Sequence, residues 1–340
     1  MSKTYDVAIV GATGLVGEVM IRILEEREFP VGRLFALASE RSVGREIKFR
    51  GETVVVENLS DFDFQQAEIG LFSAGGSISA EYAPLAAEAG CVVIDNTSYF
   101  RYEDDIPLIV PEVNAHRIRD YAGRGIIANP NCSTIQLLVA LKPIYDAVGI
   151  ERINIATYQA ISGAGRQALE QMNEHARQIL NGLEPVTDGA DKPVAFNVVP
   201  HIDEFLDNGF TKEEMKIVWE TRKILEDPNI MVNPTVARVP VYFGHSEAVH
   251  IETRTKVTAA EVQKLLNSAA GVVLLDGQEA GAYPTAATDA AGRDGVFVGR
   301  VREDPSHPRG IDLWVVSDNV RKGAALNSIQ IAEILVNQLM

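Results

Sequence analysis

A short apolar strand that runs directly into a glycine-rich turn and a helical pattern constrains the fold of this chain most strongly. Residues 5–10 read Tyr-Asp-Val-Ala-Ile-Val, and Gly11, Gly14 and Gly17 follow at intervals of three. Apolar residues then recur at helical spacing up to Glu26. Strand, glycine turn and helix in this order are typical of a dinucleotide-binding unit, in which the turn holds the pyrophosphate. The spacing departs from GxGxxG, so a purely structural turn is the alternative.

The end of the second predicted strand indicates which nicotinamide coenzyme this unit binds. The strand Leu34–Ala38 ends in Ser39-Glu40-Arg41-Ser42. NAD sites usually present an acidic group to the ribose hydroxyls, whereas an arginine between hydroxyls suits a 2′-phosphate. With Glu40 directed to solvent, Ser39, Arg41 and Ser42 predict NADP; a solvated surface arginine is the alternative.

Further strand–helix units continue this pattern as far as residue 128. Strands are predicted at 69–73 and 91–95, with a helix at 78–89 between them. Ala74 follows the first of these strands, and Arg101 lies in the loop after the second. Ligands of open α/β sheets bind at such strand ends, so Ala74 is a candidate coenzyme contact and Arg101 a candidate anion ligand. The expected fold is α/β, with a doubly wound Rossmann-type coenzyme domain.

The segment Ala128–Thr134 places a cysteine where a helix begins. Pro130 ends regular strand pairing, and Asn131 is a good helix N-cap, so Cys132 lies near the positive end of the following helix. Thiolate is the reactive form of cysteine and is favoured at such a position. Cys132 is therefore a candidate nucleophile, although a small buried side chain is the usual role of a lone cysteine. Cys91, within an apolar strand, is predicted to serve packing only.

Composition limits the partners and the cellular setting. A chain of 340 residues suggests two domains. The formal net charge of −16 argues against nucleic acid, so anionic ligands must be held by local arginines or lysines. Two cysteines argue for a reducing compartment, and no apolar run approaches the length of a membrane span. No cysteine or histidine spacing suggests a metal site. We therefore predict a cytoplasmic enzyme without metal and without nucleic-acid or membrane partners.

The second half of the chain has a different pattern. Residues 151–159 alternate like a half-buried strand, and Thr211 with Glu214 forms a capping-box signature. Further strands are predicted at 231–239, 247–255, 271–275, 295–301 and 310–317, and a helix at 324–339. The expected second domain is α+β with a mixed or antiparallel sheet.

Four motifs together identify a family that the chain resembles. They are Asn-Pro-Asn-Cys-Ser-Thr at 129–134, Gln-Ala-Ile-Ser-Gly at 159–163, Arg-Val-Pro-Val-Tyr-Phe-Gly-His-Ser-Glu at 238–247, and residues 319–325. Nearly end to end, the chain resembles aspartate-β-semialdehyde dehydrogenase, most closely the bacterial form. The resemblance implies NADPH-dependent reductive dephosphorylation of L-aspartyl-4-phosphate to L-aspartate 4-semialdehyde, with release of phosphate, in lysine, diaminopimelate, threonine and methionine biosynthesis.

The resemblance also implies residue roles. Cys132 matches the acyl-thioester nucleophile, His245 the acid/base and Gln159 the residue that orients the substrate. Substrate ligands would be Arg101, Asn131, Glu213, Lys216 and Arg238, where Glu213 meets the amino group and Arg238 the α-carboxylate. Coenzyme contacts would be Gly11, Thr13, Gly14, Leu15, Val16, Arg41, Ser42, Ser162, Gly163 and Asn319. Other members carry glutamine at the position of Asn319, a change that keeps the amide.

The domain limits and the alternatives complete the prediction. Residues 1–131, completed by the C-terminal helix 320–340, would bind NADP, and residues 132–319 would form the catalytic and dimerisation domain of a homodimer. One alternative is a reductase of N-acetylglutamyl phosphate, whose acylated amine would leave Glu213 without an ammonium partner. Another is a non-catalytic relative, which should lack Cys132 or His245.

Overall fold

The computed structural model describes residues 3–187 and 192–340. Two compact units make up the chain. Unit 1 comprises Met1–Asn131 and Ala324–Met340, and unit 2 comprises Cys132–Gly323.

Unit 1 is built on a seven-stranded sheet in the order β3-β4-β2-β1-β5-β6-β7. The strands are β1 (Tyr5–Val10), β2 (Val31–Ala38), β3 (Glu46–Phe49), β4 (Glu52–Asn58), β5 (Ile69–Phe72), β6 (Val92–Asp95) and β7 (Ile126–Ala128). All neighbours pair in parallel except β3 and β4, which form an antiparallel hairpin that the sequence pattern did not reveal. Because β2 and β5 flank β1 on opposite sides, the sheet is doubly wound and its switch point lies at the end of β1.

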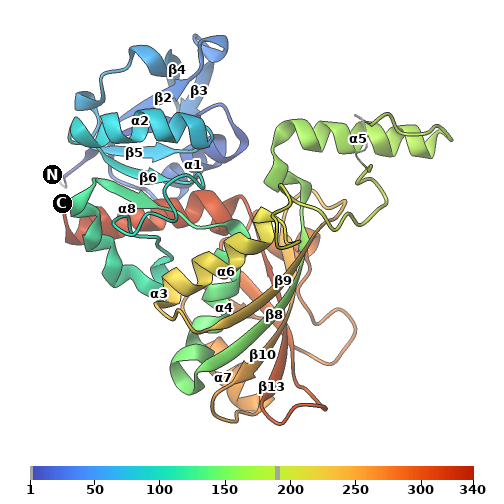
Figure 1. The fold of residues 1–340 in the computed structure, drawn as a ribbon. Coiled ribbons are helices and arrows are strands. Elements are labelled where there is room, and N and C mark those ends of the chain that lie inside the picture. The colour runs from blue at the N-terminus through green and yellow to red at the C-terminus, as the bar shows by residue number, and fades with distance from the viewer. Residues whose placement is uncertain (1–2, 188–191) are drawn as a thin grey trace. The chain divides into compact units, whose positions relative to one another are not determined.

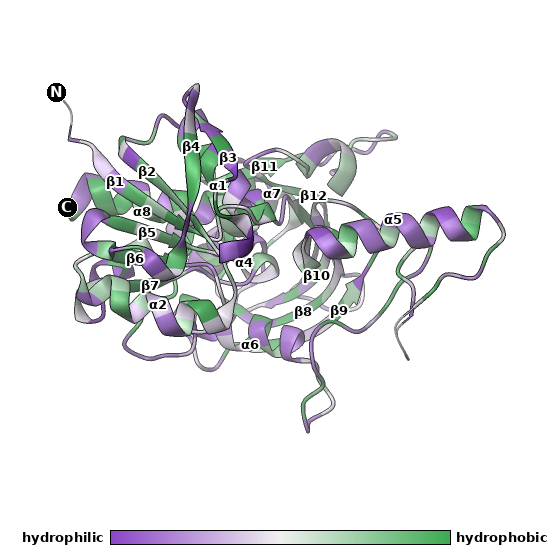
Figure 2. Cartoon of the chain, turned by 90° about the horizontal axis from the view of Figure 1, so that it is seen from above, coloured by the Kyte–Doolittle hydropathy of each residue, from purple (hydrophilic) through white to green (hydrophobic). Residues whose placement is uncertain are grey.

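The helices of unit 1 follow the βα pattern expected from the sequence. They are α1 (Leu15–Glu26), α2 (Gly76–Glu88), the short α3 (Pro111–Asn114) and α8 (Leu326–Gln338), with 3₁₀ turns η1 (Glu40–Ser42), η2 (Leu59–Asp61), η3 (Phe64–Gln66) and η4 (Ala115–Gly123). Helix α8 packs against α1 and β6, so the end of the chain completes this unit (Figure 1). The strands β5, β6 and β7 are buried along their whole length and are mostly green in Figure 2.

The glycine turn after β1 leaves no room for side chains. Gly11 has φ of +92°, and a Cβ there would lie 3.0 Å from the backbone nitrogen of Ala74. A Cβ on Gly17 would lie 2.2 Å from the carbonyl oxygen of Gly11. Helix α1 begins at Leu15, directly after Gly14. A glycine turn that leads directly into a helix start is the arrangement that binds a pyrophosphate in dinucleotide-binding units.

Unit 2 contains a six-stranded mixed sheet in the order β11-β12-β13-β10-β8-β9. The strands are β8 (Ile150–Gln159), β9 (Met231–Arg238), β10 (His245–Thr253), β11 (Val272–Leu274), β12 (Val296–Glu303) and β13 (Gly310–Ser317). Strand β10 is antiparallel to both β8 and β13, whereas β9 is parallel to β8 and β11 to β12. A two-domain α/β fold with a mixed second sheet is thereby confirmed.

One face of this sheet is covered by helices. Alternate residues of β8 and β10 are buried, and helices α4 (Cys132–Val148), α6 (Lys212–Leu225) and α7 (Ala259–Asn267) pack on the sheet. We call the buried side the inner face. Helix α5 (Arg166–Leu180) stands away from the strands β8, β9 and β10 in Figure 1. The remaining elements are η5 (Ile161–Ala164) and the π-helical turns Ala286–Ala290 and Arg321–Ala325.

Two local predictions have a clear outcome. The capping box is confirmed: Thr211 accepts a hydrogen bond from the Glu214 N–H, and Glu214 accepts one from the Thr211 N–H. The predicted start of the strand at residue 247 is wrong by two residues, because β10 begins at His245. His245 is therefore part of the sheet and does not lie in a loop.

Among the described helices, none is long and apolar enough to cross a bilayer.

The crowding at Gly17 gives a first prediction. Gly17→Ala should destabilise unit 1 by about 1–3 kcal/mol, because the new methyl group would overlap the Gly11 carbonyl. Urea unfolding measures the loss. The control is Gly76→Ala at the start of α2, where the nearest atom to a Cβ is 3.9 Å away and the change should be neutral or slightly stabilising. Equal stability of Gly17→Ala and wild type would contradict the predicted crowding.

Candidate active site

The centre of the candidate site is a contact between a thiol and an imidazole in unit 2. Cys132 is the first residue of α4, and His245 is the first residue of β10. The Cys132 Sγ and His245 Nε2 atoms are 3.1 Å apart. The cysteine is partly exposed, whereas the histidine is completely buried. The sulfur therefore lies at the start of α4, and the imidazole next to it lies at the start of β10.

Hydrogen bonding assigns the tautomer of the buried imidazole. The Ala160 N–H donates to His245 Nδ1 at 3.0 Å. A neutral ring that accepts at Nδ1 carries its hydrogen on Nε2, and this hydrogen then points at the Cys132 sulfur. Burial, helped by the positive charge of Arg238, lowers the pKa of His245 to about 3. The imidazole is consequently neutral at pH 7 and donates a hydrogen bond to the sulfur.

Gln159 connects the start of α4 with α6. It is the last residue of β8, and its Nε2 donates to Ser133 Oγ at 2.8 Å and to Glu213 Oε1 at 3.0 Å. Its Oε1 is buried and makes no hydrogen bond with the described residues. The amide is thus fixed through its nitrogen while its oxygen remains able to accept a hydrogen bond.

A charged cluster lies on α6 and the segment before it. Lys216 Nζ is 3.0 Å from Glu213 Oε2 and 2.7 Å from Asp203 Oδ2. Burial opposes the charge of Lys216, but Glu213 and Asp203 outweigh it and raise the lysine pKa. The Glu213 and Lys216 side chains are only 9% and 12% exposed, so this ion pair is largely shielded from solvent.

Arg238 provides a second cation near the imidazole. It ends β9, and its Nη1 donates to the Ala160 carbonyl at 2.7 Å. Burial lowers the pKa of Arg238, while Glu213 and Cys132 act in the opposite direction; the guanidinium nevertheless stays charged. A Cβ on Gly163 would lie 3.0 Å from Nη1 and 3.4 Å from the His245 ring. Glycine at this position therefore allows the backbone to approach both side chains.

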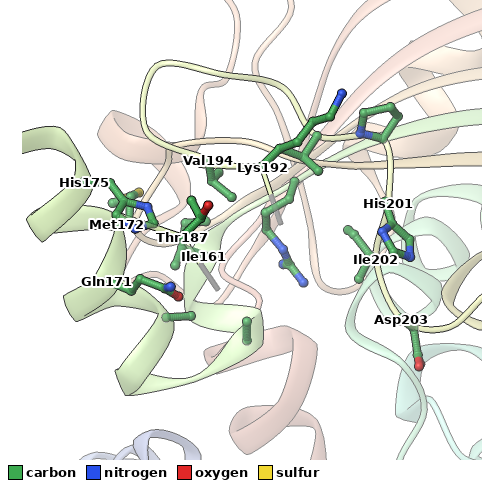
Figure 3. Close-up of a pocket in the computed structure, with 15 residues that line it drawn as sticks. Ile161, Gln171, Met172, His175, Thr187, Lys192, Val194, His201, Ile202 and Asp203 are labelled. Atoms are coloured by element: carbon green, nitrogen blue, oxygen red, sulfur yellow. The ribbon is translucent and has the colours of Figure 1, made fainter. Parts of the chain in front are cut away.

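A cavity of about 510 Å³ opens beside this cluster in unit 2 (Figure 3). Arg238 and Asp203 form part of its wall, and Gln171, Met172 and His175 reach it from α5. Figure 3 shows Ile161 and Val194 on the same side as these α5 residues, with His201 and Asp203 on the opposite side. The cavity combines apolar residues with a few charged groups, and among the predicted site residues Arg238 lines it.

Asn319 and Ser162 are bound to one another. Asn319 Oδ1 accepts from the Gly244 N–H at 2.9 Å, and the Asn319 amide is hydrogen-bonded to Ser162 Oγ at 3.0 Å. Both side chains are at least 96% buried. In this structure the two predicted coenzyme contacts therefore fix the backbone immediately before His245.

The other predicted residues lie in unit 1. Thr13 Oγ1 donates to Ser42 Oγ at 3.4 Å, which joins the glycine turn to the segment after β2. The candidate coenzyme residues Gly11, Gly14, Leu15, Val16 and Ala74 lie on the turn or beside it, and Ser39 and Arg41 lie in or next to the exposed turn η1. Arg101 and Asn131 are each 6% exposed. Arg101 Nη2 donates to the Asn96 carbonyl at 3.0 Å.

Sequence reasoning missed two groups that contact the predicted residues. Ser133 is bound by Gln159, and Asp203 by Lys216. Asp203 has φ of +70°, which is unusual for a residue other than glycine. Ser133 directly follows the cysteine, so it could have been proposed from its position, whereas no local pattern marks Asp203. In the described ranges 3–187 and 192–340, no group of three or more metal-ligating side chains is arranged around a common point.

Two family models match the chain. The model described as "Semialdehyde dehydrogenase, NAD binding domain" matches residues 6–121, and "Semialdehyde dehydrogenase, dimerisation domain" matches residues 141–322. Aspartate-semialdehyde dehydrogenase 2 of Vibrio cholerae serotype O1 is 59% identical over 336 residues, which cover 99% of each chain. Aspartate-semialdehyde dehydrogenase of Legionella pneumophila is 57% identical, covering 100% of this chain and 98% of the relative.

Solved structures agree with these matches. Aspartate semialdehyde dehydrogenase II from Vibrio cholerae, complexed with ASA, superimposes with a TM-score of 0.97 at 58% identity and covers 100% of both chains. The Candida albicans enzyme, crystallised with NADP, gives a TM-score of 0.74 at 27% identity over 98% of this chain and 99% of that one. Together these matches show that the chain belongs to the aspartate-semialdehyde dehydrogenase family.

Proposed function

We propose that this enzyme forms L-aspartate 4-semialdehyde from L-aspartyl-4-phosphate with NADPH, through a thioester on Cys132. The observation that carries the proposal is the 3.1 Å contact between Cys132 Sγ and His245 Nε2. Thiolate attack on the acyl carbon forms a carbon–sulfur bond, and the carbon–oxygen bond to phosphate breaks with its electron pair on the phosphate. Hydride addition to the thioester carbon, followed by loss of the thiolate, gives the aldehyde.

His245 would stabilise the sulfur anion through its Nε2 hydrogen. The tautomer limits the predicted acid/base role of His245. Its Nε2 already carries the ring hydrogen, so Nε2 can accept the thiol proton only in the other tautomer, which has its hydrogen on Nδ1. That hydrogen would face the Ala160 N–H, which now donates to Nδ1. Binding of an anion at Arg238 would remove one cause of the low His245 pKa and so favour proton uptake.

Charge complementarity supports the substrate assignment. Arg238 would bind the α-carboxylate, and Glu213 would bind the α-ammonium group. Lys216 and, from unit 1, Arg101 are the proposed phosphate ligands, with Asn131 as a further polar contact. In a chain of net charge −16, these buried cations supply the local attraction that two anionic groups require. Gln159 would orient the substrate through its buried Oε1.

The coenzyme supplies the hydride when it is bound. The crowded turn at Gly11 and Gly17, together with the start of α1, fits a pyrophosphate. Arg41 between Ser39 and Ser42 favours a 2′-phosphate, so we propose NADP as the coenzyme; the Candida albicans relative was also solved with NADP. Ser162, Gly163 and Asn319 stay predicted contacts of the same coenzyme.

The assembly and the biological setting follow from the family. The match to a dimerisation domain over residues 141–322 supports a homodimer built through unit 2. We propose that the enzyme acts in the cytoplasm, where its product feeds the biosynthesis of lysine, threonine and methionine.

Removal of the nucleophile tests the mechanism. Cys132→Ala should reduce turnover by at least about 10⁴-fold, because no neighbouring group can form the thioester. NADPH binding, measured by nucleotide fluorescence, should stay within about twofold of wild type, since the coenzyme is predicted to bind through other residues. The control Cys91→Ala removes a buried thiol that packs in unit 1 and should leave turnover intact. Substantial turnover by Cys132→Ala would exclude the thioester.

Coenzyme preference is tested at η1. Arg41→Ala should raise the KM for NADPH by about 10-fold or more and leave the KM for NADH nearly unchanged, because only the 2′-phosphate needs the guanidinium. Arg45→Ala, a nearby exposed arginine, is the control. If both coenzymes lose affinity equally, Arg41 does not select between them.

The buried imidazole predicts an acid-sensitive stability. The unfolded chain takes up a proton at its histidine near pH 6.5, whereas folded His245 resists protonation down to a pKa of about 3. Its contribution is present above pH 6.5 and is lost as pH falls towards 3. Relative to His245→Gln, wild type should therefore lose about 2 kcal/mol between pH 7 and pH 5 in urea unfolding. If the free energy of unfolding changed equally with pH in wild type and His245→Gln, the low pKa of His245 would be contradicted.

A further inference from the structure

A buried carboxyl group lies two residues after His245 on the same face of β10. Glu247 has 0% exposure, and neither carboxyl oxygen has a hydrogen-bond partner of good geometry among the described residues. Its pKa is raised well above the ordinary value by burial, which the adjacent Gln136 amide offsets only in part. Leaving an ionised carboxylate in such surroundings is unfavourable, whereas a neutral carboxylic acid gains a donor.

Other buried polar atoms around Glu247 also lack donors or acceptors within the described part of the chain. Gln136 Oε1, on α4, makes no hydrogen bond, and neither does Thr157 Oγ1, directly opposite Glu247 on β8. On β13 the opposite residue is Val315, which carries no charge. Besides Glu247, His245 is a titratable residue of this face on β10. The helices packed on the face carry Cys132, one turn before Gln136 on α4, and the buried Glu213 and Glu220 on α6. A single proton on Glu247 would give Gln136 Oε1 the donor that it needs.

Gln136 links this group to the reactive pair. Its Nε2 donates to the main-chain carbonyl of His245 at 3.4 Å. Gln136 lies four residues after Cys132, on the same side of α4. Fixing the Gln136 amide therefore fixes the start of β10 against the start of α4, and with it the distance from sulfur to imidazole.

From this arrangement we infer that Glu247 is a positioning residue that stays protonated in the folded enzyme and donates to Gln136 Oε1. The carboxylic acid orients the Gln136 amide, and the amide holds the His245 backbone in register with Cys132. The role rests on the proposed function, because it matters for turnover only if Cys132 and His245 perform the reaction. No proton is transferred from Glu247 to the substrate.

The first test measures the protonation state without any substrate. Folded Glu247 would hold a proton that the unfolded chain releases near pH 4.3, so its stabilisation is lost as pH rises. Compared with Glu247→Gln, the folding equilibrium constant of wild type should fall by about tenfold per pH unit between pH 5 and pH 7. A flat difference for Glu247→Gln would mean an ionised carboxylate and would overturn the inference.

The second test separates positioning from folding. Glu247→Gln keeps a neutral donor and should retain kcat within about twofold, whereas Glu247→Leu and Gln136→Leu should each lower kcat by about tenfold with little change in KM. The double variant should be no worse than either single variant, because both remove the same hydrogen bond. Equal activity losses in Glu247→Gln and Glu247→Leu would overturn the role.

Iodoacetamide provides a readout that is independent of the proposed reaction. The rate of Cys132 alkylation and its pH profile should change in Gln136→Leu and Glu247→Leu but match wild type in Glu247→Gln. Unchanged alkylation in all three variants would overturn positioning. An enzyme inactive towards aspartate semialdehyde that still shows the pH slope and the alkylation pattern would refute the proposed function and leave the inference standing.

Discussion

The contact between Cys132 and His245 depends on two element starts being held together. The sulfur lies on the first residue of α4 and the imidazole on the first residue of β10, and these residues are 113 positions apart in the chain. Hydrogen bonds from Ala160 to the ring and from Gln136 to the backbone hold the histidine in place. Because each bond comes from a regular element or the turn next to it, the reactive geometry is built by the sheet and α4 and does not rely on a long loop.

In unit 2 the imidazole next to the Cys132 sulfur is neutral, whereas the basic side chains Arg238 and Lys216 are charged. Burial keeps the imidazole without charge, while Arg238 and Lys216 retain theirs because carboxylates oppose the effect of desolvation. Glu213 favours the charged form of both cations: it forms an ion pair with Lys216, and its negative charge raises the pKa of Arg238. A substrate with two anionic groups would compete for these cations, so its binding would alter the field at His245. In the proposed mechanism, Glu213 would therefore couple substrate binding to activation of Cys132.

Much of this arrangement could be predicted from local patterns. The strand, glycine turn and helix at residues 5–26 and the capping box at Thr211 follow from short-range rules, and the structure contains both. The hairpin β3–β4 was missed because its strands are mostly exposed and so lack a buried apolar pattern. Strand β10 was predicted to begin too late, since a glycine and a histidine precede its apolar alternation. The bond from Lys216 to Asp203 joins residues 13 positions apart and has no sequence signal, so only tertiary structure reveals it.

The inner face of β10 shows why such groups resist prediction. His245 and Glu247 are ordinary titratable residues in the sequence, and each acquires its protonation state from being buried under α4. Desolvation disfavours the charged form of both, which removes the proton from an imidazole and retains it on a carboxyl group. Burial therefore leaves both the imidazole and the carboxyl group of this strand neutral. The contribution of His245 to stability is lost as pH falls, whereas that of Glu247 is lost as pH rises. With both groups neutral, neither His245 nor Glu247 adds charge beside the sulfur.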